Sequence, residues 1–146
     1  MIETGRREDL DWPAFQAFAR GDNSESVLLA YKRKSIRFLD LRPGDRILDL
    51  GCGHGHDASE MARVGGPGGG GVAIDRSPGA IRRSKASVGP DGPRPHFLLA
   101  DARHTGLPAA SFDVIRSDRI LQDNDDPQEI LGECVRLLRP GGRLAL

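Results

Sequence analysis

The sequence lacks long apolar segments of both the membrane-spanning and the signal-peptide kind. No apolar run approaches the ~20 residues that a membrane-spanning helix needs. The first ten residues carry several charges and have no apolar core of the kind found in signal peptides. We therefore expect no membrane partner and a cytoplasmic location.

Cysteine is scarce and neither sign of charge is in excess. The two cysteines, Cys52 and Cys134, are too few for a disulfide framework, and we expect both to be reduced, small structural side chains. The 21 basic and 21 acidic residues give a formal net charge of zero. Because no cluster of basic and aromatic residues is evident either, we expect no nucleic acid partner.

Glycine and proline, by contrast, are plentiful, and they gather in a few connecting segments. Between these segments, short apolar stretches alternate with stretches of helical spacing. The expected strands are 46–50, 72–75, 96–100, 112–116 and one from 143 onward. The expected helices are 57–64, one opening at Ser77-Pro78 and one opening at Asp126-Pro127, with Ser77 and Asp126 as the caps. This alternation predicts βαβ units and an α/β fold, a doubly wound, Rossmann-like parallel sheet with helices on both faces.

Helical spacing also describes the N-terminal part of the chain. We expect a helical segment over 1–40, followed by the α/β domain over 41–146. Asp11-Trp12-Pro13 is typical of a helix start, and a second helix is expected to end near Leu39. In the helix that follows Asp126, one wide apolar stripe is expected, made of Ile130, Leu131, Cys134, Val135, Leu137 and Leu138.

A glycine-rich turn follows the first expected strand of the α/β domain. Asp49-Leu50 leads into Gly51-Cys52-Gly53-His54-Gly55. Ligands of such sheets bind at the carboxyl ends of the strands, beside the point where the strand order reverses. Glycines permit a tight turn there and let a ligand approach the backbone, and the next helix offers free N–H groups to a carboxylate.

Acidic residues fall at the ends of the next two strands as well. Asp75 ends the second strand, where its carboxylate is well placed to accept hydrogen bonds from two ribose hydroxyls. Asp101 follows the third strand and can accept a hydrogen bond from an exocyclic amine such as that of adenine. Each acid alone could serve only as a turn or helix cap. Three acids at three successive strand ends favour a binding site.

Together these motifs resemble the class I S-adenosylmethionine (SAM) dependent methyltransferases. Asp49 to Gly55 looks like the family's first motif, acid-x-Gly-x-Gly-x-Gly, and Asp75 sits where the family's ribose-binding acid falls. Asp101-Ala102 resembles the adenine-contacting motif. The segment 137–144, which reads LLRPGGRL, is similar to the lead into the family's fifth strand. The resemblance covers 41–146 and implies a strand order of 3-2-1-4-5.

The resemblance also implies residue roles. Gly51 and Gly53 would let the methionine part of SAM approach the turn, with Asp49 oriented toward its amino group. Asp75 would hold the ribose, and Asp101 with the Ala102 N–H would read the adenine. The implied cofactor-binding residues are Asp49, Gly51, Cys52, Gly53, Asp75, Arg76, Asp101, Ala102 and Ser117.

The implied reaction is methyl transfer from SAM to an acceptor. We expect a small molecule rather than a nucleic acid, and the sequence leaves a protein acceptor open. Arg116, Ser117 and Asp118 are expected beside the transferred methyl group and the acceptor. A general base is needed only if the acceptor must lose a proton. Asp118 and His54 are both candidates for that base, and the sequence does not choose between them.

Three other interpretations compete with this one. An NAD-binding Rossmann domain would require Gly-x-Gly-x-x-Gly, but His56 stands where the third glycine should be. A metal site near His54 and His56, or in the acidic cluster of Asp123, Asp125 and Asp126, lacks a ligand set of the usual spacing, and we expect no metal. A truncated, non-catalytic SAM-binding module is the most serious rival. The family normally adds two further strands, and an exposed fifth strand would favour self-association.

Overall fold

The computed structural model describes residues 25–89, 93–122 and 124–146. The chain divides into two compact units, Met1–Asp40 and Leu41–Leu146. In the first unit, α2 spans Glu25–Phe38. The helix start expected at Asp11-Trp12-Pro13 lies outside the described residues. No helix in the described ranges is both long enough and apolar enough to cross a membrane.

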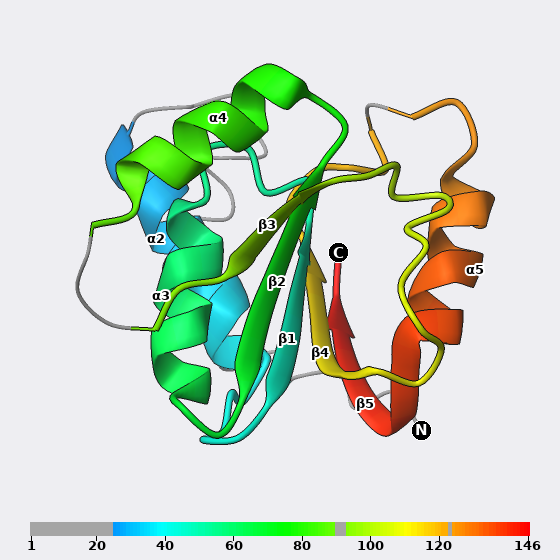
Figure 1. The fold of residues 1–146 in the computed structure, drawn as a ribbon, viewed down its shortest axis with the longest axis horizontal. Helices are drawn as coiled ribbons and strands as arrows, with labels where there is room; N and C mark the ends of the chain where they lie inside the picture. The colour runs from blue at the N-terminus through cyan, green and yellow to red at the C-terminus, as the bar shows by residue number, and fades with distance from the viewer. Residues whose placement is uncertain (1–24, 90–92, 123) are drawn as a thin grey trace. The chain divides into compact units, whose positions relative to one another are not determined.

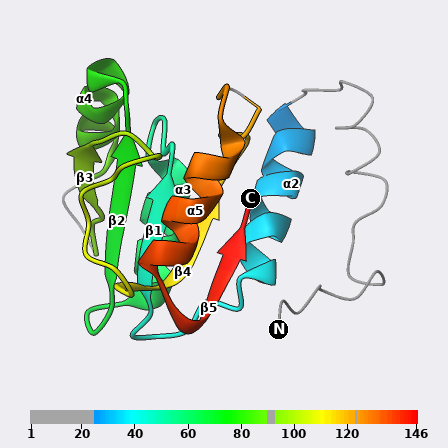
Figure 2. The same cartoon turned by 90° about the vertical axis from the view of Figure 1, so that its right-hand side faces the viewer.

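The second unit is a five-stranded parallel sheet with helices on both faces. The strand order is β3-β2-β1-β4-β5, which confirms the predicted fold class and order. Figures 1 and 2 show α3 and α4 on one face and α5 on the other. The elements are β1 (Arg46–Leu50), α3 (His56–Gly65), β2 (Gly70–Asp75), α4 (Pro78–Ser87), β3 (His96–Leu99), β4 (Phe112–Ser117), α5 (Pro127–Leu137) and β5 (Leu138–Ala145).

The helix starts follow from local side chains. The Ser77 hydroxyl accepts a hydrogen bond from the Ala80 N–H at the start of α4, and Pro78 occupies the first turn. The Asp126 carboxylate accepts from two backbone N–H groups in the first turn of α5. These are the caps that the sequence predicted, because a cap satisfies backbone donors that have no partner inside the helix.

The sheet positions the site because its central strands are almost completely buried. β1 and β4 contribute fully buried apolar side chains to the larger core cluster, which also contains side chains from α5. The strands run parallel, so their carboxyl ends share one edge of the sheet. Burial of this kind fixes the positions of the loops that leave that edge.

The expectations from the sequence for β5 and α5 were wrong. The fifth strand begins at Leu138, directly after α5, rather than at 143, because Leu138 pairs with Phe112 before an irregularity in the ladder. The apolar stripe of α5 is also narrower than expected. Leu131 and Val135 are 38% and 70% exposed, and the buried apolar positions are Ile130, Cys134 and Leu137.

Packing requires glycine at two positions in and just before β2. A Cβ on Gly69 would collide with the Asp45 carbonyl oxygen, and one on Gly71 would lie 3.0 Å from the Ala62 side chain. Gly70 and Gly71 already belong to β2 and pair with Arg46 and Ile47. The second strand therefore begins two residues before the expected Val72.

Candidate functional site

The glycine turn after β1 lies against the end of β2. The backbone N–H groups of Gly51 and Cys52 donate to the Ile74 carbonyl at 2.8 and 2.9 Å. Gly53 has a φ of 52°, and a Cβ there would meet no atom within 4 Å. Gly55 has a φ of 77°, and its Cβ would lie 2.6 Å from the Phe97 ring. Gly55 is thus needed for packing, whereas Gly53 faces open space.

Asp75 connects the turn to the next helix. Its Oδ2 accepts a hydrogen bond from the Gly53 N–H at 3.0 Å, and its Oδ1 accepts from the Ser77 N–H at 2.8 Å. A carboxylate has about four acceptor sites. Both oxygens of Asp75 therefore keep acceptor capacity for donors on a ligand.

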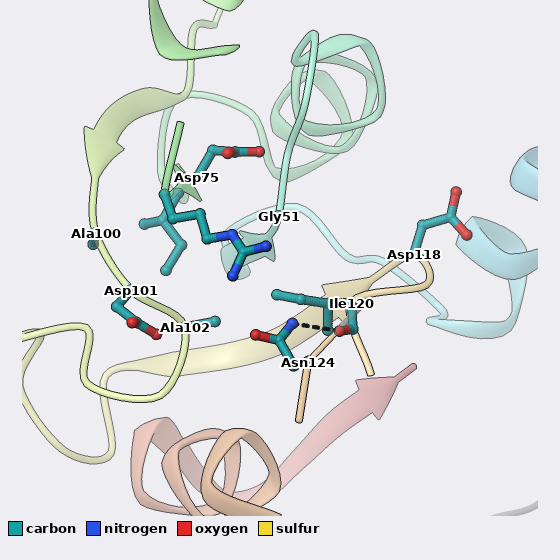
Figure 3. A pocket seen from close by; sticks show the side chains of 10 residues that line it. Gly51, Asp75, Ala100, Asp101, Ala102, Asp118, Ile120 and Asn124 are labelled. Carbon is teal, nitrogen blue, oxygen red and sulfur yellow. Dashed lines mark hydrogen bonds between the residues drawn. The ribbon is translucent and has the colours of Figure 1, made fainter. Parts of the chain in front are cut away.

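A pocket of about 200 Å³ opens at this edge of the sheet (Figure 3). Five of the nine predicted cofactor-binding residues are among those that line it: Gly51, Asp75, Arg76, Asp101 and Ala102. The other lining residues are Ile74, Ala100, Asp118, Ile120 and Asn124. The structure thus brings the ends of β1, β2 and β3 together around one cavity, together with the loop that follows β4.

Asp101 forms one wall of the pocket and is held by Arg103. The Arg103 guanidinium donates to both carboxylate oxygens, with Nη2–Oδ2 at 2.6 Å and Nε–Oδ1 at 3.1 Å. These hydrogen bonds lower the pKa of Asp101 from its usual value of 3.8 to about 2. The side chain remains 41% exposed. It is therefore an ionised and accessible acceptor at neutral pH.

The opposite wall comes from the loop after β4 and was not identified in the sequence, apart from Asp118. Figure 3 shows Ile120 and Asn124 across the cavity from Asp101, with Asp118 farther away and its carboxylate directed away from these side chains. Both carboxylate oxygens of Asp118 are buried, and Oδ1 lies 3.5 Å from Arg119 Nε. Asn124 Nδ2 donates to the Ile120 carbonyl at 2.6 Å, which closes the loop on itself. The only available signal was proximity in sequence to the end of β4, since neither side chain belongs to a recognisable motif.

Four predicted residues are not among those that line the pocket. Ser117 is buried, and its hydroxyl donates to the Leu50 carbonyl at 2.6 Å, so it joins β4 to β1. Cys52 is also buried, and desolvation raises the pKa of its thiol to about 12. Gly53 acts through its N–H to Asp75, and Asp49 is buried at the end of β1. Direct cofactor contact by these four residues stays a prediction.

A buried arginine lies behind the glycine turn. The Arg116 guanidinium, whose side chain is 2% exposed, lies 3.0 Å from Asp57 Oδ2 and 3.8 Å from Asp49 Oδ1. Asp57 occupies the first turn of α3. Arg116 was expected beside the acceptor. It instead connects the ends of β1 and β4 to the start of α3.

Hydrogen bonds to Glu133 hold the loop that carries Asp101 and Ala102 against α5. Thr105 donates to Glu133 through its N–H at 2.9 Å and through its hydroxyl at 2.6 Å. Arg136 donates to the same carboxylate. The hydrogen bonds from Arg136, followed by those from Thr105, lower the pKa of Glu133 from 4.5 to about 2.

The described residues offer no group of three or more His, Cys, Asp and Glu side chains that could hold a metal ion. His54 and His56 are exposed, with ring centroids 6.4 Å apart. His54 is not among the residues lining the pocket, which separates it from the other candidate base, Asp118. Asp123, part of the acidic cluster considered for a metal, lies outside the described residues.

Comparison with known proteins gives consistent matches. A family model described as methyltransferase domain matches residues 48–146. The chain is 38% identical over 117 residues to an uncharacterized 37.1 kDa protein in transposon TN4556 of Streptomyces fradiae, across 80% of this chain and 34% of that protein. It is 38% identical over 108 residues to 27-O-demethylrifamycin SV methyltransferase of Amycolatopsis mediterranei, across 74% and 40% of the two chains.

A solved structure matches the fold as well. The arsenic(III) S-adenosylmethionine methyltransferase from Chlamydomonas reinhardtii aligns with a TM-score of 0.65 at 27% identity, over 71% of this chain and 38% of that chain. The present chain therefore spans less than half the length of each of these three relatives.

Proposed function

Because the chain belongs to the methyltransferase domain family, whose cofactor is SAM, we propose that it binds SAM in the pocket at the carboxyl ends of the strands and transfers the methyl group to a small-molecule acceptor. One observation carries the proposal. Asp75 Oδ2 accepts from the Gly53 N–H, so the carboxylate that is proposed to bind the ribose lies beside the glycine turn.

The chemistry of the pocket fits SAM. The carboxylates of Asp75 and Asp101 suit donors such as ribose hydroxyls and the adenine amine. Ile74 and Ile120 provide apolar surface for a planar ring. At about 200 Å³ the cavity is smaller than the roughly 300–1,000 Å³ typical of drug-sized ligands, so its lining suits the nucleoside part of the cofactor. The methionine part would extend past Gly53, where a side chain would otherwise stand.

Bound SAM supplies an electrophilic methyl group on a sulfonium that leaves as a neutral thioether. The contribution of the chain is to hold the cofactor and the acceptor in line, which lowers the entropic part of the barrier. With adenine beside Asp101, the acceptor would lie toward the Asp118 end of the cavity (Figure 3). Of the two candidate bases, Asp118 lines the pocket and His54 does not. Both carboxylate oxygens of Asp118 are buried and Oδ1 lies 3.5 Å from Arg119 Nε, so the proposal assigns no general base.

The site suits a dinucleotide less well. A pyrophosphate on a Rossmann-like sheet rests at the N-terminus of the helix after β1. Here His56 stands where the dinucleotide fingerprint has its third glycine, which allows close packing of that helix against the strand. We therefore propose SAM rather than NAD.

The acceptor is proposed to be an organic small molecule. The relative from Amycolatopsis mediterranei is named for methylation of a rifamycin, and the neighbour from Chlamydomonas reinhardtii for methylation of arsenic(III). Arsenic(III) is thiophilic, and thiolates are the ligands that soft centres prefer. Cys52 and Cys134 are buried in two separate core clusters and neither lines the pocket, so in this chain they do not converge on one arsenic(III) centre. This supports an organic acceptor over arsenic(III).

Labelled methyl transfer tests the proposal. The 146-residue chain is incubated with methyl-labelled SAM and a panel of hydroxylated polyketides, with arsenite plus excess thiol as a separate arm. We expect label in at least one polyketide and none in arsenic. SAM binding without transfer to any acceptor would support the non-catalytic module, and transfer to arsenic would contradict the proposed acceptor class.

Self-association is proposed for the same chain. Among the described residues, β5 pairs with β4 alone and ends the sheet order, and edge strands of this kind favour pairing with another chain. Sedimentation velocity over a range of concentrations tests it. A concentration-dependent dimer is expected, and a monomer at every concentration would contradict this part of the proposal.

A further inference from the structure

A deeply buried charge of the second unit, Arg116, lies next to the glycine turn. Arg116 is among the largest fully buried side chains, and its Nη1 donates to Asp57 Oδ2 at 3.0 Å. The same Nη1 lies 3.8 Å from Asp49 Oδ1, and the Asp49 side chain is 3% exposed. One cation therefore faces two carboxylates, one on β1 and one on α3.

The backbone dictates this arrangement. Asp49 and Arg116 are direct partners in the parallel pairing of β1 with β4, so their side chains leave the sheet on the same face. Asp57 follows the turn by only two residues, in the first turn of α3. The three charges therefore flank the segment from Gly51 to Gly55 at both of its ends.

Arginine suits this position better than lysine. Its guanidinium presents five donors in a fixed planar fork and can serve two carboxylates at once, whereas the lysine ammonium is a compact point charge. A buried carboxylate without a nearby cation or donors is strongly unfavourable. Arg116 thus supplies a fixed counter-charge for Asp49.

We propose that Arg116 is a positioning residue for the amino-acid end of SAM: it orients the Asp49 carboxylate toward the cofactor's amino group, and Asp57 holds Arg116 in place. The proposal rests on the proposed function, since Asp49 can receive the amino group only if SAM binds here. It extends that function by dividing the site into two parts. Asp75 and Asp101 serve the nucleoside, whereas the Asp49–Arg116–Asp57 cluster serves the methionine part.

A purely structural role is the alternative to exclude. If Arg116 only joined β1, β4 and α3, its loss would weaken every ligand of the pocket alike. A positioning role affects only ligands that carry the amino group. S-adenosylhomocysteine and 5′-methylthioadenosine separate the two roles, because both are uncharged at sulfur and contain adenosine, but only the former has the amino-acid portion.

The experiment measures the affinity of both ligands for the 146-residue chain by calorimetry. Arg116→Met should lower the affinity for S-adenosylhomocysteine by roughly tenfold or more, because that ligand loses one hydrogen-bonded charge interaction. The affinity for 5′-methylthioadenosine, which lacks the amino group, should change by less than about twofold. Arg116→Lys should recover part of the loss. The double variant Arg116→Met with Asp49→Asn should bind S-adenosylhomocysteine no more weakly than Asp49→Asn alone, because both changes act through one carboxylate.

Two further variants keep the test decisive. Arg139→Met removes a different ion pair, Arg139–Asp113, and should leave both affinities unchanged. Asp57→Asn keeps Arg116 and should also lose affinity for S-adenosylhomocysteine but not for 5′-methylthioadenosine, by a smaller factor. This variant provides the test if Arg116→Met does not unfold cooperatively. Equal weakening of both ligands, or no weakening of either, would overturn the proposal. A wild-type chain that binds neither ligand would instead contradict the proposed function.

Discussion

The backbone N–H of Gly53 donates to Asp75 Oδ2 at 3.0 Å, and this hydrogen bond joins the glycine turn after β1 to the end of β2. The two residues are 22 positions apart in the sequence. Their contact follows from parallel pairing, because β1 and β2 end at the same edge of the sheet. Any ligand that uses both the turn and the carboxylate must therefore bind at this edge.

Replacement of Asp75 should reduce the free energy of SAM binding more than it reduces the free energy of unfolding. Asp75→Ala removes the proposed ribose acceptor, and we expect a loss of about 10–100-fold in SAM affinity, since hydrogen bonds to a charged group are worth about 1.5–3 kcal/mol. Calorimetric titration with SAM measures the effect. Ser77→Ala is the matched control. It removes the α4 cap and about 1 kcal/mol of stability but leaves the carboxylate in place. Equal SAM affinity in wild type and Asp75→Ala would show that the ribose assignment is wrong.

A methyl group on Gly53 should obstruct the cofactor. Gly53→Ala and Gly44→Ala both place alanine at a positive φ, 52° and 92°, with no atom within 4 Å of the new Cβ. Each should lose a similar ~1–2 kcal/mol of stability through backbone strain. Only Gly53→Ala should also lose SAM affinity, by roughly tenfold or about 1.4 kcal/mol, because Gly44 lies in the turn before β1. Thermal unfolding and SAM titration of the two variants check this, and parallel losses of affinity would refute it.

The hydrogen bonds of Glu133 hold the loop after β3 against α5, and their contribution to stability should depend on pH. Hydrogen bonds from Arg136 and Thr105 lower the pKa of Glu133 from 4.5 to about 2. A lowered folded-state pKa stabilises the protein above the unfolded pKa, and that stabilisation is lost as the pH falls through the folded pKa. Glu133→Gln should therefore destabilise the chain at pH 7, and its stability difference from wild type should shrink between about pH 5 and pH 2.

Urea unfolding across this pH range provides the measurement for Glu133. Glu60→Gln, an exposed change on α3, is the control and should follow the wild-type profile at every pH. If the difference in stability between wild type and Glu133→Gln stayed constant from pH 7 to pH 2, the role assigned to the Glu133 carboxylate would be wrong.

Both thiols should be unreactive in the folded chain. Cys52 and Cys134 are buried, and desolvation raises their pKa values to about 12 and 11, so little thiolate exists at pH 8. We expect labelling by a thiol reagent at pH 8 to be slow when the chain is folded and to reach two equivalents rapidly in denaturant. Fast labelling of the folded chain would mean that one thiol is exposed, and it would reopen arsenic(III) as an acceptor.

The sequence was most informative where local rules and burial agree. β1 was predicted with its observed bounds, because a short apolar stretch between a turn and a glycine motif has few alternatives. Ser77 and Asp126 were predicted as caps for the same reason. Asp75 could be placed at the pocket because the parallel topology fixes where a strand end lies.

The sequence was least informative where contacts are tertiary. Ile120 and Asn124 line the pocket only because the loop after β4 folds across it. No local sequence pattern predicts the course of that loop. Arg116 reads as one charged residue in an apolar strand. Its pairing with Asp57 depends on the packing of α3 against the sheet. The early start of β5 likewise depends on Leu138 pairing with Phe112.

Titration of the 146-residue chain with SAM and, separately, with NAD tests the central claim most directly. The chain is first shown to unfold cooperatively, and the heat of binding is then measured for each ligand. We predict saturable one-to-one binding of SAM, lost or strongly weakened in Asp75→Ala, and no measurable binding of NAD. A folded chain that binds NAD, or that binds SAM with the same affinity in wild type and Asp75→Ala, would contradict the account.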